Sequence, residues 1–179
     1  MTVRKALETI FREHELEDFL WIRAADIVVA QWVRMKCMFG CWEYGQSATC
    51  PPEMPTVAEC ERFIREYADA VLFHFSGRVT NPEDRYEWSM DIDRRLVEVE
   101  RRVFLAGFPK AFLLSMGSCR FCDDCTAERT TCRVQKLARP TPEALAVDVF
   151  STVRKHGYPI DVLTDYDQEM NRYAFLLVE

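Results

Sequence analysis

The chain has 179 residues, of which 49% are apolar and 29% are charged, with a formal net charge of −6 at pH 7. This length and balance are typical of one globular domain over residues 1–179, with or without a bound metal. They exclude a disordered or fibrous protein. The sequence contains no basic run that would follow a phosphate backbone and no apolar stretch of membrane-spanning length, so neither nucleic acid nor a membrane is an expected partner.

Eight cysteines are the unusual feature of the composition. The chain opens on an amphipathic pattern instead of the apolar segment of a signal peptide, so we expect a cytoplasmic protein. Disulfides are rare in the reducing cytosol, and clustered cysteines there indicate metal binding or thiol chemistry.

The first predicted elements alternate between helix and strand. Leu7, Ile10 and Phe11 indicate an early helix, and residues 25–33 are predicted to form a strand. Residues 37–52 then form what we call the first cysteine loop. Thr56 and Glu59 match a capping box and predict a helix start, and the apolar run 70–75 predicts a buried strand.

The second half begins with a helix-start signal at Asn81-Pro82. Apolar residues at spacings of three and four from Trp88 to Val103 predict a long amphipathic helix that ends near Gly107. Residues 110–116 are predicted to form a buried strand that leads directly into the second cysteine loop, residues 118–132. A helix over 141–157 and two final strands, 158–163 and 173–178, with a turn between them, complete the prediction.

This order of elements predicts an α/β fold, with α+β as the alternative. We expect a single domain with a mixed β-sheet, helices packed on it and two cysteine-rich metal-binding loops. The final two strands are joined by too short a connection for a crossover helix, so they should be antiparallel. Because both cysteine loops are predicted to follow strands, we expect them to meet at one end of the sheet.

The second cysteine loop carries the most specific chemical signal. Three cysteines follow one another with two-residue spacers, and a fourth comes after six further residues: Cys119, Cys122, Cys125 and Cys132. Iron–sulfur clusters need several thiolates within a tight loop, and bacterial ferredoxins use the same two-residue spacers. The longer last gap leaves two possibilities for Cys132, which either completes this site or ligates a second one. The rival is a structural four-cysteine zinc site, although zinc ligands usually arrive as two separated pairs.

The first cysteine loop supplies three further candidate ligands, Cys37, Cys41 and Cys50. The fourth ligand of such a site would be Cys132, another side chain, a partner protein or a small ligand. An open position on the metal would allow a substrate to bind, by the same logic as an open catalytic zinc. Cys60 shares a helical face with Val57 and Ile64, so we interpret it as a small buried hydrophobe.

At these loops the sequence resembles a family of bacterial and archaeal proteins of unknown function that are described as predicted metal-binding proteins. The resemblance covers most of the chain. In that family proline often follows the second cysteine, where this sequence has Trp42. The matching positions are Lys36-Cys37, Gly40-Cys41, Tyr44-Gly45, Cys50-Pro51-Pro52, Cys119, Cys122, Cys125, Cys132, Leu137-Ala138-Arg139-Pro140, and the segment through Ala144 and Asp148. The resemblance implies seven cysteine ligands and little about activity.

Three functional hypotheses follow. The leading one is a protein with one or two [4Fe-4S] clusters that transfers electrons or assists an anaerobic redox or cofactor system, with a redox protein or a small molecule as its partner. The second is an enzyme that activates a small substrate at an open cluster iron. The third is a zinc-stapled interaction module.

Overall fold

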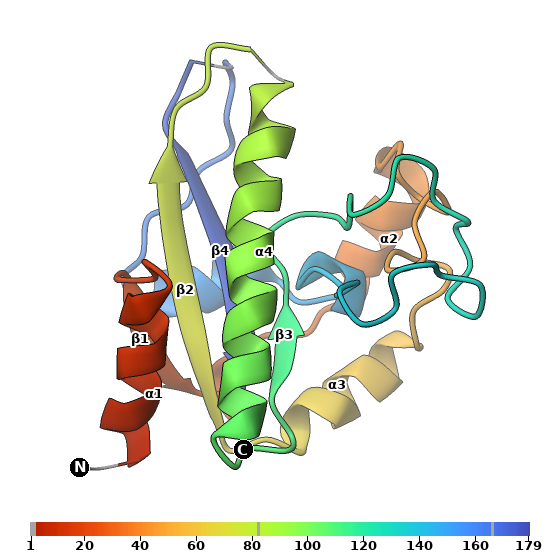
Figure 1. Ribbon diagram of the computed structural model, residues 1–179. Helices are drawn as coiled ribbons and strands as arrows, with labels where there is room; N and C mark the ends of the chain where they lie inside the picture. The colour runs from red at the N-terminus through yellow and green to blue at the C-terminus, as the bar shows by residue number, and fades with distance from the viewer. Residues whose placement is uncertain (1–2, 82, 166) are drawn as a thin grey trace.

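The centre of the protein is a four-stranded sheet in the order β1-β2-β4-β3, in a computed structural model that describes residues 3–81, 83–165 and 167–179. The strands are β1 (Phe19–Arg23), β2 (Asp69–Gly77), β3 (Phe112–Leu114) and β4 (Met170–Leu177). Long β2 and β4 pair over eight residues, from Ala70 opposite Leu177 to Gly77 opposite Met170. These two strands are the central pair of the sheet (Figure 1).

Helices cover both faces of the sheet, and the strands alternate between two cores. Ala174 and Leu176 of β4 pack with α1 (Val3–Glu13) and α4 (Asp84–Leu105), whereas Tyr173 and Phe175 pack with α3 (Val57–Arg65) and α5 (Val149–Lys155). This period of two is what a strand buried on both faces requires.

Helix α4 is the longest element and crosses the sheet in front of β2 and β4 in Figure 1. Ile92, Leu96, Val99 and Val103 are buried at helical spacing, as predicted. Gly107 follows with a φ of +103°, a conformation that favours glycine and ends the helix. The predicted start at Asn81-Pro82 lies partly outside the described residues, since Pro82 is not among them.

The capping box before α3 is confirmed. The backbone N–H of Glu59 donates to Oγ1 of Thr56 at 3.3 Å, and the N–H of Thr56 donates to Oε2 of Glu59 at 2.9 Å. The two side chains thereby supply acceptors for two backbone N–H groups that have no partner within the helix.

The predicted class, helices packed on a sheet in an α/β fold, is confirmed, but the pairing of the strands differs in one respect. Every pairing among the described strands is antiparallel, so the sheet is not mixed. Strands β2 and β3 do run in the same direction, as a connection through α4 predicts. They do not pair because β4 lies between them and is antiparallel to both.

The predicted strand over 25–33 is wrong. Residues 24–26 form a 3₁₀ turn, η1 (Ala24–Asp26), and α2 (Gln31–Gly40) begins soon afterwards. Between them, Val29 makes an isolated bridge with Val147. The apolar run is therefore buried by packing and one bridge, and the strand that pairs with β2 is β1, just before it.

The C-terminal third also differs from prediction. Ala146 takes a left-handed conformation with a φ of +60°, which divides the predicted helix 141–157 into a 3₁₀ turn, η2 (Glu143–Leu145), and α5. Residues 158–163 form no strand, although Ile160 is buried in the core. The predicted final pair is therefore wrong, and β4 pairs instead with β2 and β3.

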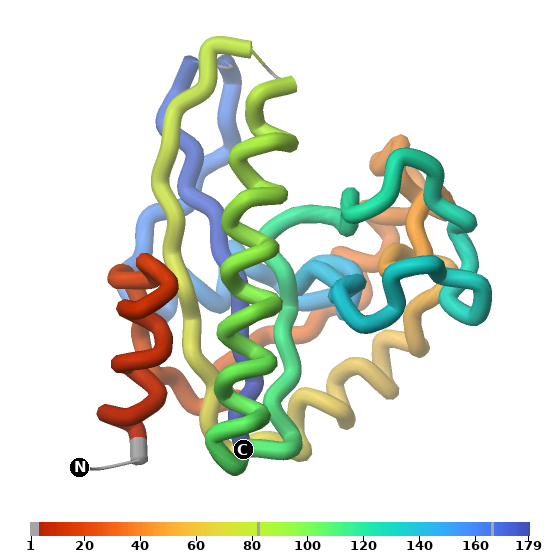
Figure 2. Tube along the Cα trace, in the orientation of Figure 1, coloured from red at the N-terminus to blue at the C-terminus, as the bar shows by residue number. Residues whose placement is uncertain are grey.

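The two cysteine loops lie on one side of the molecule, to the right in Figures 1 and 2. The start of α1 and the end of the chain after β4 lie at the lower edge of the same view, away from those loops. The sheet and its helices thus separate the chain ends from the cysteines.

Candidate metal centre

Seven of the eight cysteines belong to two segments that lie side by side. The first cysteine loop starts with the last turn of α2, which carries Cys37, and continues without helix or strand to α3. The second follows β3, and no helix or strand interrupts residues 115–142. Figure 2 shows the two traces adjacent to each other, and hydrogen bonds join them. The expected meeting of the loops is observed, although the first follows a helix and not a strand.

Two carboxylates connect the loops. Glu43 accepts a hydrogen bond from Oγ of Ser118 at 2.7 Å and forms an ion pair with Arg120. Glu53, just after the first loop, accepts a hydrogen bond from the backbone N–H of Arg129 at 2.9 Å. These contacts join residues about 75 positions apart and hold the two cysteine groups on one side of the fold.

In the first group, Cys37, Cys41 and Cys50 differ in exposure. Cys41 is exposed, whereas Cys37 and Cys50 are half-buried. Burial, followed by the charge of Cys41, raises the pKa of the Cys37 thiol. Burial, followed by the charges of Glu43, Cys41 and Cys37, raises the pKa of Cys50 to about 12. The three thiols therefore influence one another electrostatically.

These three cysteines line a cavity with a volume of about 630 Å³. Trp32 and Lys36 of α2 line the same cavity, as does Arg172 of β4. A volume of this size falls within the range of roughly 300–1,000 Å³ that holds small organic ligands.

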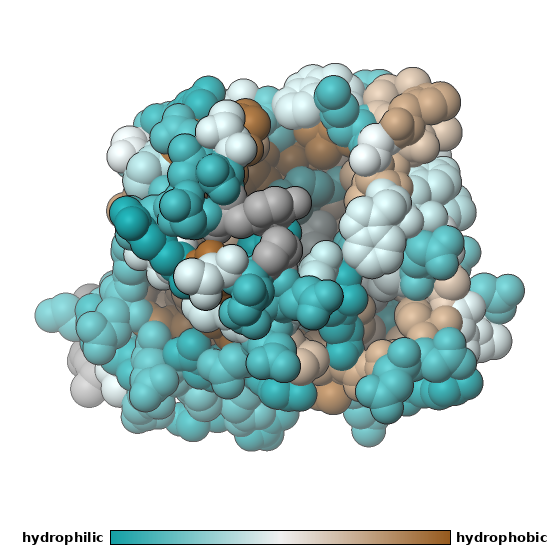
Figure 3. Space-filling model, turned by 90° about the horizontal axis from the view of Figure 1, so that it is seen from above, coloured by the Kyte–Doolittle hydropathy of each residue, from teal (hydrophilic) through white to brown (hydrophobic). Residues whose placement is uncertain are grey.

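Apolar side chains surround the first group at the surface. Met35, Met38 and Phe39 on α2 are 43%, 44% and 78% exposed, so this helix presents hydrophobic residues to solvent. Seen from above, the surface is largely hydrophilic, and hydrophobic residues gather at the corner on the α2 side (Figure 3). Exposed apolar groups beside a functional site are typical of an interaction surface.

The second group contains Cys119, Cys122, Cys125 and Cys132, all half-buried. Burial, followed by the charges of Cys122, Cys132 and Cys125, raises the pKa of Cys119. Burial and the charge of Cys125 likewise raise the pKa of Cys122. All four thiols are therefore within electrostatic range on one loop.

Within the described residues, no three His, Cys, Asp or Glu side chains converge closely enough to hold a single metal ion. The chemistry of the donor set nevertheless fits a thiophilic metal, because both groups consist of thiols on neighbouring segments with little regular structure. Raised thiol pKa values also mean that a bound metal displaces protons from these sulfurs. The structure brings the seven predicted cysteines into two groups. In neither group do the thiols converge on a common point as the ligands of one bound metal ion would.

Cys60 belongs to neither group. It lies on α3, is 1% exposed in the core, and its thiol donates to the carbonyl of Pro55 at 3.5 Å. The interpretation of Cys60 as a small buried hydrophobe is confirmed.

Several residues around the site are not predicted by the sequence patterns. Arg120 lies over the ring of Tyr86, 3.9 Å from its centroid, and 5.8 Å from that of Trp42. Tyr86 belongs to α4, which carries no cysteine, and nothing in its spacing links it to the loops. Glu43 and Glu53 lie within or beside a cysteine loop, and that placement is the one signal that would have suggested a role.

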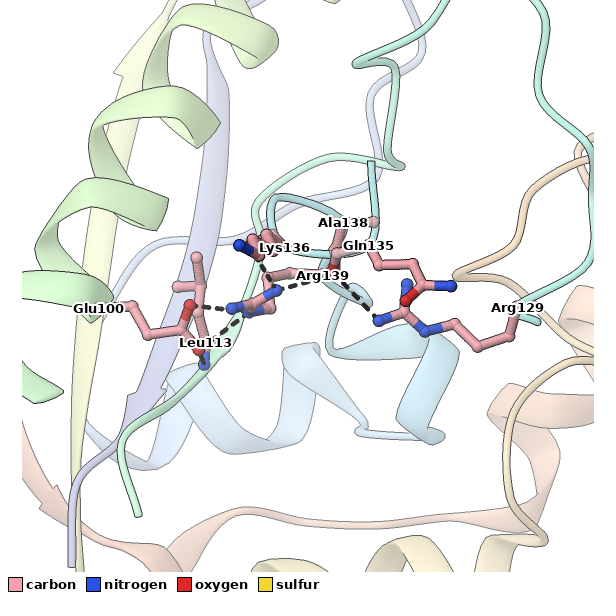
Figure 4. A network of polar contacts seen from close by, with 7 residues as sticks. All are labelled: Glu100, Leu113, Arg129, Gln135, Lys136, Ala138 and Arg139. Atoms are coloured by element: carbon pink, nitrogen blue, oxygen red, sulfur yellow. Dashed lines mark hydrogen bonds and ion pairs between the residues drawn. The ribbon is translucent and has the colours of Figure 1, made fainter. Parts of the chain in front are cut away.

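A buried ion pair fixes the chain just after the second cysteine loop. Nε of Arg139 donates to both carboxylate oxygens of Glu100, at 2.9 and 2.7 Å, and Glu100 also accepts from the backbone N–H of Leu113 at 2.9 Å (Figure 4). The figure also shows Arg129 reaching the carbonyl of Gln135 within the same segment. Glu100 of α4 therefore holds the chain on both sides of the second cysteine loop, at Leu113 before it and at Arg139 after it.

Comparison with known proteins assigns this arrangement to a family. A family model described as predicted metal-binding protein (DUF2284) matches residues 20–178. The chain belongs to this family. The DUF2284 match spans both cysteine loops, and it confirms the predicted family resemblance.

No curated protein and no solved structure matches the chain. In the described part of the chain, no helix combines the length and the apolar character needed to cross a bilayer. Membership of DUF2284 supports metal binding as the general property of the protein.

Proposed function

We propose that this protein binds iron–sulfur clusters and transfers electrons. Cys119, Cys122, Cys125 and Cys132 would hold one four-iron cluster, and Cys37, Cys41 and Cys50 would contribute to a second. The observation that supports this most is the grouping of seven thiols on two loops that Glu43 and Glu53 connect. When bound, a four-iron cluster supplies one-electron transfer.

The second loop favours iron–sulfur over zinc. Its first three cysteines are separated by two residues each, and the loop forms no hairpin or helix of the kind that carries paired zinc ligands. Arg120 lies in this loop and Arg133 directly follows it, and the charge of Arg133 lowers the pKa of Cys122 against the larger effect of burial. These cations would offset the negative charge of four thiolates.

The side chains around the thiols control access of water and the exit of electrons. Trp42 and Tyr86 line a cavity that also includes Cys119, Cys122 and Cys125, and they limit solvent contact there. Cys41, in contrast, is exposed beside the apolar residues of α2. We propose that a redox protein docks at this exposed side, where electrons have the shortest path out of the fold.

One observation favours a second function. Cys37, Cys41 and Cys50 open onto the cavity of about 630 Å³, and three thiols leave one ligand position of a four-iron site to another group. A small substrate in this cavity would lie directly beside that position. The alternative function is therefore an enzyme that binds and activates a small molecule there.

Anaerobic purification followed by iron, zinc and sulfide analysis and a visible spectrum tests the proposal. About eight iron and eight sulfide per chain support two four-iron clusters, and about four of each support one. Colourless protein that contains zinc without sulfide overturns the redox function and favours a structural zinc module.

Single substitutions then assign the ligands. We expect Cys122→Ser to lose the visible absorbance of the second group, and Cys50→Ser to lose only the part that the first group contributes. Cys60→Ala is the matched control, because that thiol is buried in the core and is not one of the seven candidate ligands. A Cys122→Ser variant with full iron and sulfide content contradicts the assignment.

A further inference from the structure

A smaller cavity, lined in part by Cys119, lies between α4 and the start of the second cysteine loop. Its volume is about 200 Å³, below the range of roughly 300–1,000 Å³ that is typical for drug-sized ligands. A cavity of this volume has room for several groups the size of a water molecule. The residues that matter here are Arg85, Asp93, Cys119, Arg120, Arg139 and Arg172.

The charge of this cavity is opposite to that of the whole protein. Four arginines line it, against the carboxylates of Glu43 and Asp93, in a chain with a formal net charge of −6. Guanidinium groups are planar donors that match the oxygens of carboxylates and phosphates. A concave site with this lining attracts small anions.

Part of the donor capacity of Arg120 is not used among the described residues. Nε of Arg120 is buried and has no hydrogen-bond partner among the described residues. The side chain of Arg172 donates from Nη2 to the carbonyl of Met116 at 3.1 Å, and its charge also acts on the carboxyl of Asp93. Arg139 is different, since its Nε is fully engaged by Glu100. Buried donors without partners in a native fold require an explanation, and a bound anion provides one.

The wall of the cavity is fixed by close packing. Asp93 accepts hydrogen bonds from the backbone N–H groups of Met116 and Gly117, at 2.9 and 3.1 Å. A Cβ on Gly117 would lie 3.2 Å from both Asp93 and Ser89, so a side chain at this position would push these neighbours aside. The floor of the site therefore does not need to rearrange to receive a ligand. Burial also raises the pKa of Asp93 to about 7, which reduces its repulsion of an anion.

We propose that this cavity binds a small oxyanion, a phosphate or a short dicarboxylate, through Arg85, Arg120 and Arg172. Binding requires only the arginines and stands without any metal. Its role, which is to place the anion beside the metal centre at Cys119, rests on the proposed function.

Isothermal titration calorimetry tests the binding on protein as purified, with inorganic phosphate in one series and malonate in another. Chloride at matched ionic strength controls for general screening. We expect saturable binding of at least one of the two anions, and the tighter of the two identifies the class of ligand. Absence of saturable binding for both overturns the proposal and leaves the arginines as counter-charges for the thiolates.

Substitutions locate the binding. We expect Arg172→Gln and Arg85→Gln each to weaken it at least about tenfold, as the loss of a charge-assisted hydrogen bond requires. Arg62→Gln on the exposed side of α3 is the matched control and should leave the affinity unchanged. Equal affinity in all three variants overturns the proposal, and thermal melts of each variant exclude misfolding as the cause of any loss.

Metal analysis of the same preparations separates the two proposals. Anion binding by a preparation without iron or zinc supports the cavity and contradicts the metal function. A metal-loaded preparation that binds neither anion contradicts the cavity and leaves the metal function intact.

Discussion

The carboxylate of Glu43 in the first cysteine loop accepts a hydrogen bond from the hydroxyl of Ser118 in the second, with 2.7 Å between the two oxygens. Ser118 immediately precedes Cys119, and Glu43 lies two residues after Cys41. The same carboxylate pairs with Arg120, on the other side of Cys119. One acidic side chain thus positions the backbone on both sides of a candidate ligand.

Replacement of Glu43 should therefore weaken metal retention without removing a thiol. We expect Glu43→Ala to lose its metal to a chelator about tenfold faster than the natural protein, because residues that orient ligands typically affect metal affinity 10- to 100-fold. The loss is followed by absorbance under anaerobic conditions. Glu61→Ala, which removes an exposed partner of Arg65 on α3, is the control. Equal release rates in both variants would show that the loops do not depend on this contact.

Removal of the metal should loosen the loops and leave the sheet intact. The two cores on either face of the sheet contain none of the seven candidate ligands. We expect amides of residues 118–132 to exchange rapidly after chelation, whereas those of β2 and β4 keep their protection in hydrogen-exchange measurements. Simultaneous loss of protection in β2 and β4 would show that the metal is required for the whole fold.

The ion pair between Glu100 and Arg139 should contribute far more to stability than others on the same helix. The side chain of Glu100 is 7% exposed and that of Arg139 is 22% exposed, so removal of Glu100 leaves the half-buried Arg139 without its counter-charge. We expect Glu100→Ala to lower the free energy of unfolding by about 3–5 kcal/mol. Glu98→Ala, whose partner is the exposed Arg101, should cost at most about 1 kcal/mol. Urea denaturation measures both, and similar losses would contradict the prediction.

Asp93 should make the protein less stable as the pH rises. Burial raises its pKa from 3.8 to about 7, so between about pH 4 and pH 7 the folded protein holds a proton that the unfolded chain has released. The free energy of unfolding therefore falls across this window, by up to about 4 kcal/mol for a shift of about three pH units.

Urea denaturation of chelated protein between pH 4 and pH 7 measures this slope without interference from metal release. We expect Asp93→Asn to flatten it, because the amide does not titrate. Asp91→Asn, at an exposed position of the same helix, should keep the slope. A slope that survives in Asp93→Asn would assign the pH dependence to other groups.

The sequence was most informative where local signals agree with burial. The capping box at Thr56 and Glu59 and the apolar spacing from Ile92 to Val103 predict α3 and α4 correctly, because each helix is specified by its own residues. The strand predicted at 25–33 fails for the opposite reason. Its apolar residues are held by long-range contacts such as the bridge from Val29 to Val147, and periodicity does not reveal these contacts.

The cysteines could be predicted as candidate ligands because their spacing is local, whereas their surroundings could not. Glu43 reaches Ser118 and Arg120 across about 75 residues, and Tyr86 approaches Arg120 from a separate helix. Arg85 and Arg172 likewise come from α4 and β4 to one cavity. Such convergence depends on how the chain is folded, and one sequence contains no pattern that specifies it.

The position of the chain ends has a practical consequence. The start of α1 and the end of β4 lie away from both cysteine loops (Figure 1). A molecule tethered to an electrode or a resin through either end would therefore present its thiols to the solution and not to the support. Direct voltammetry on an immobilised layer is thus feasible with a terminal tag, without any change to the candidate ligands or the residues around them.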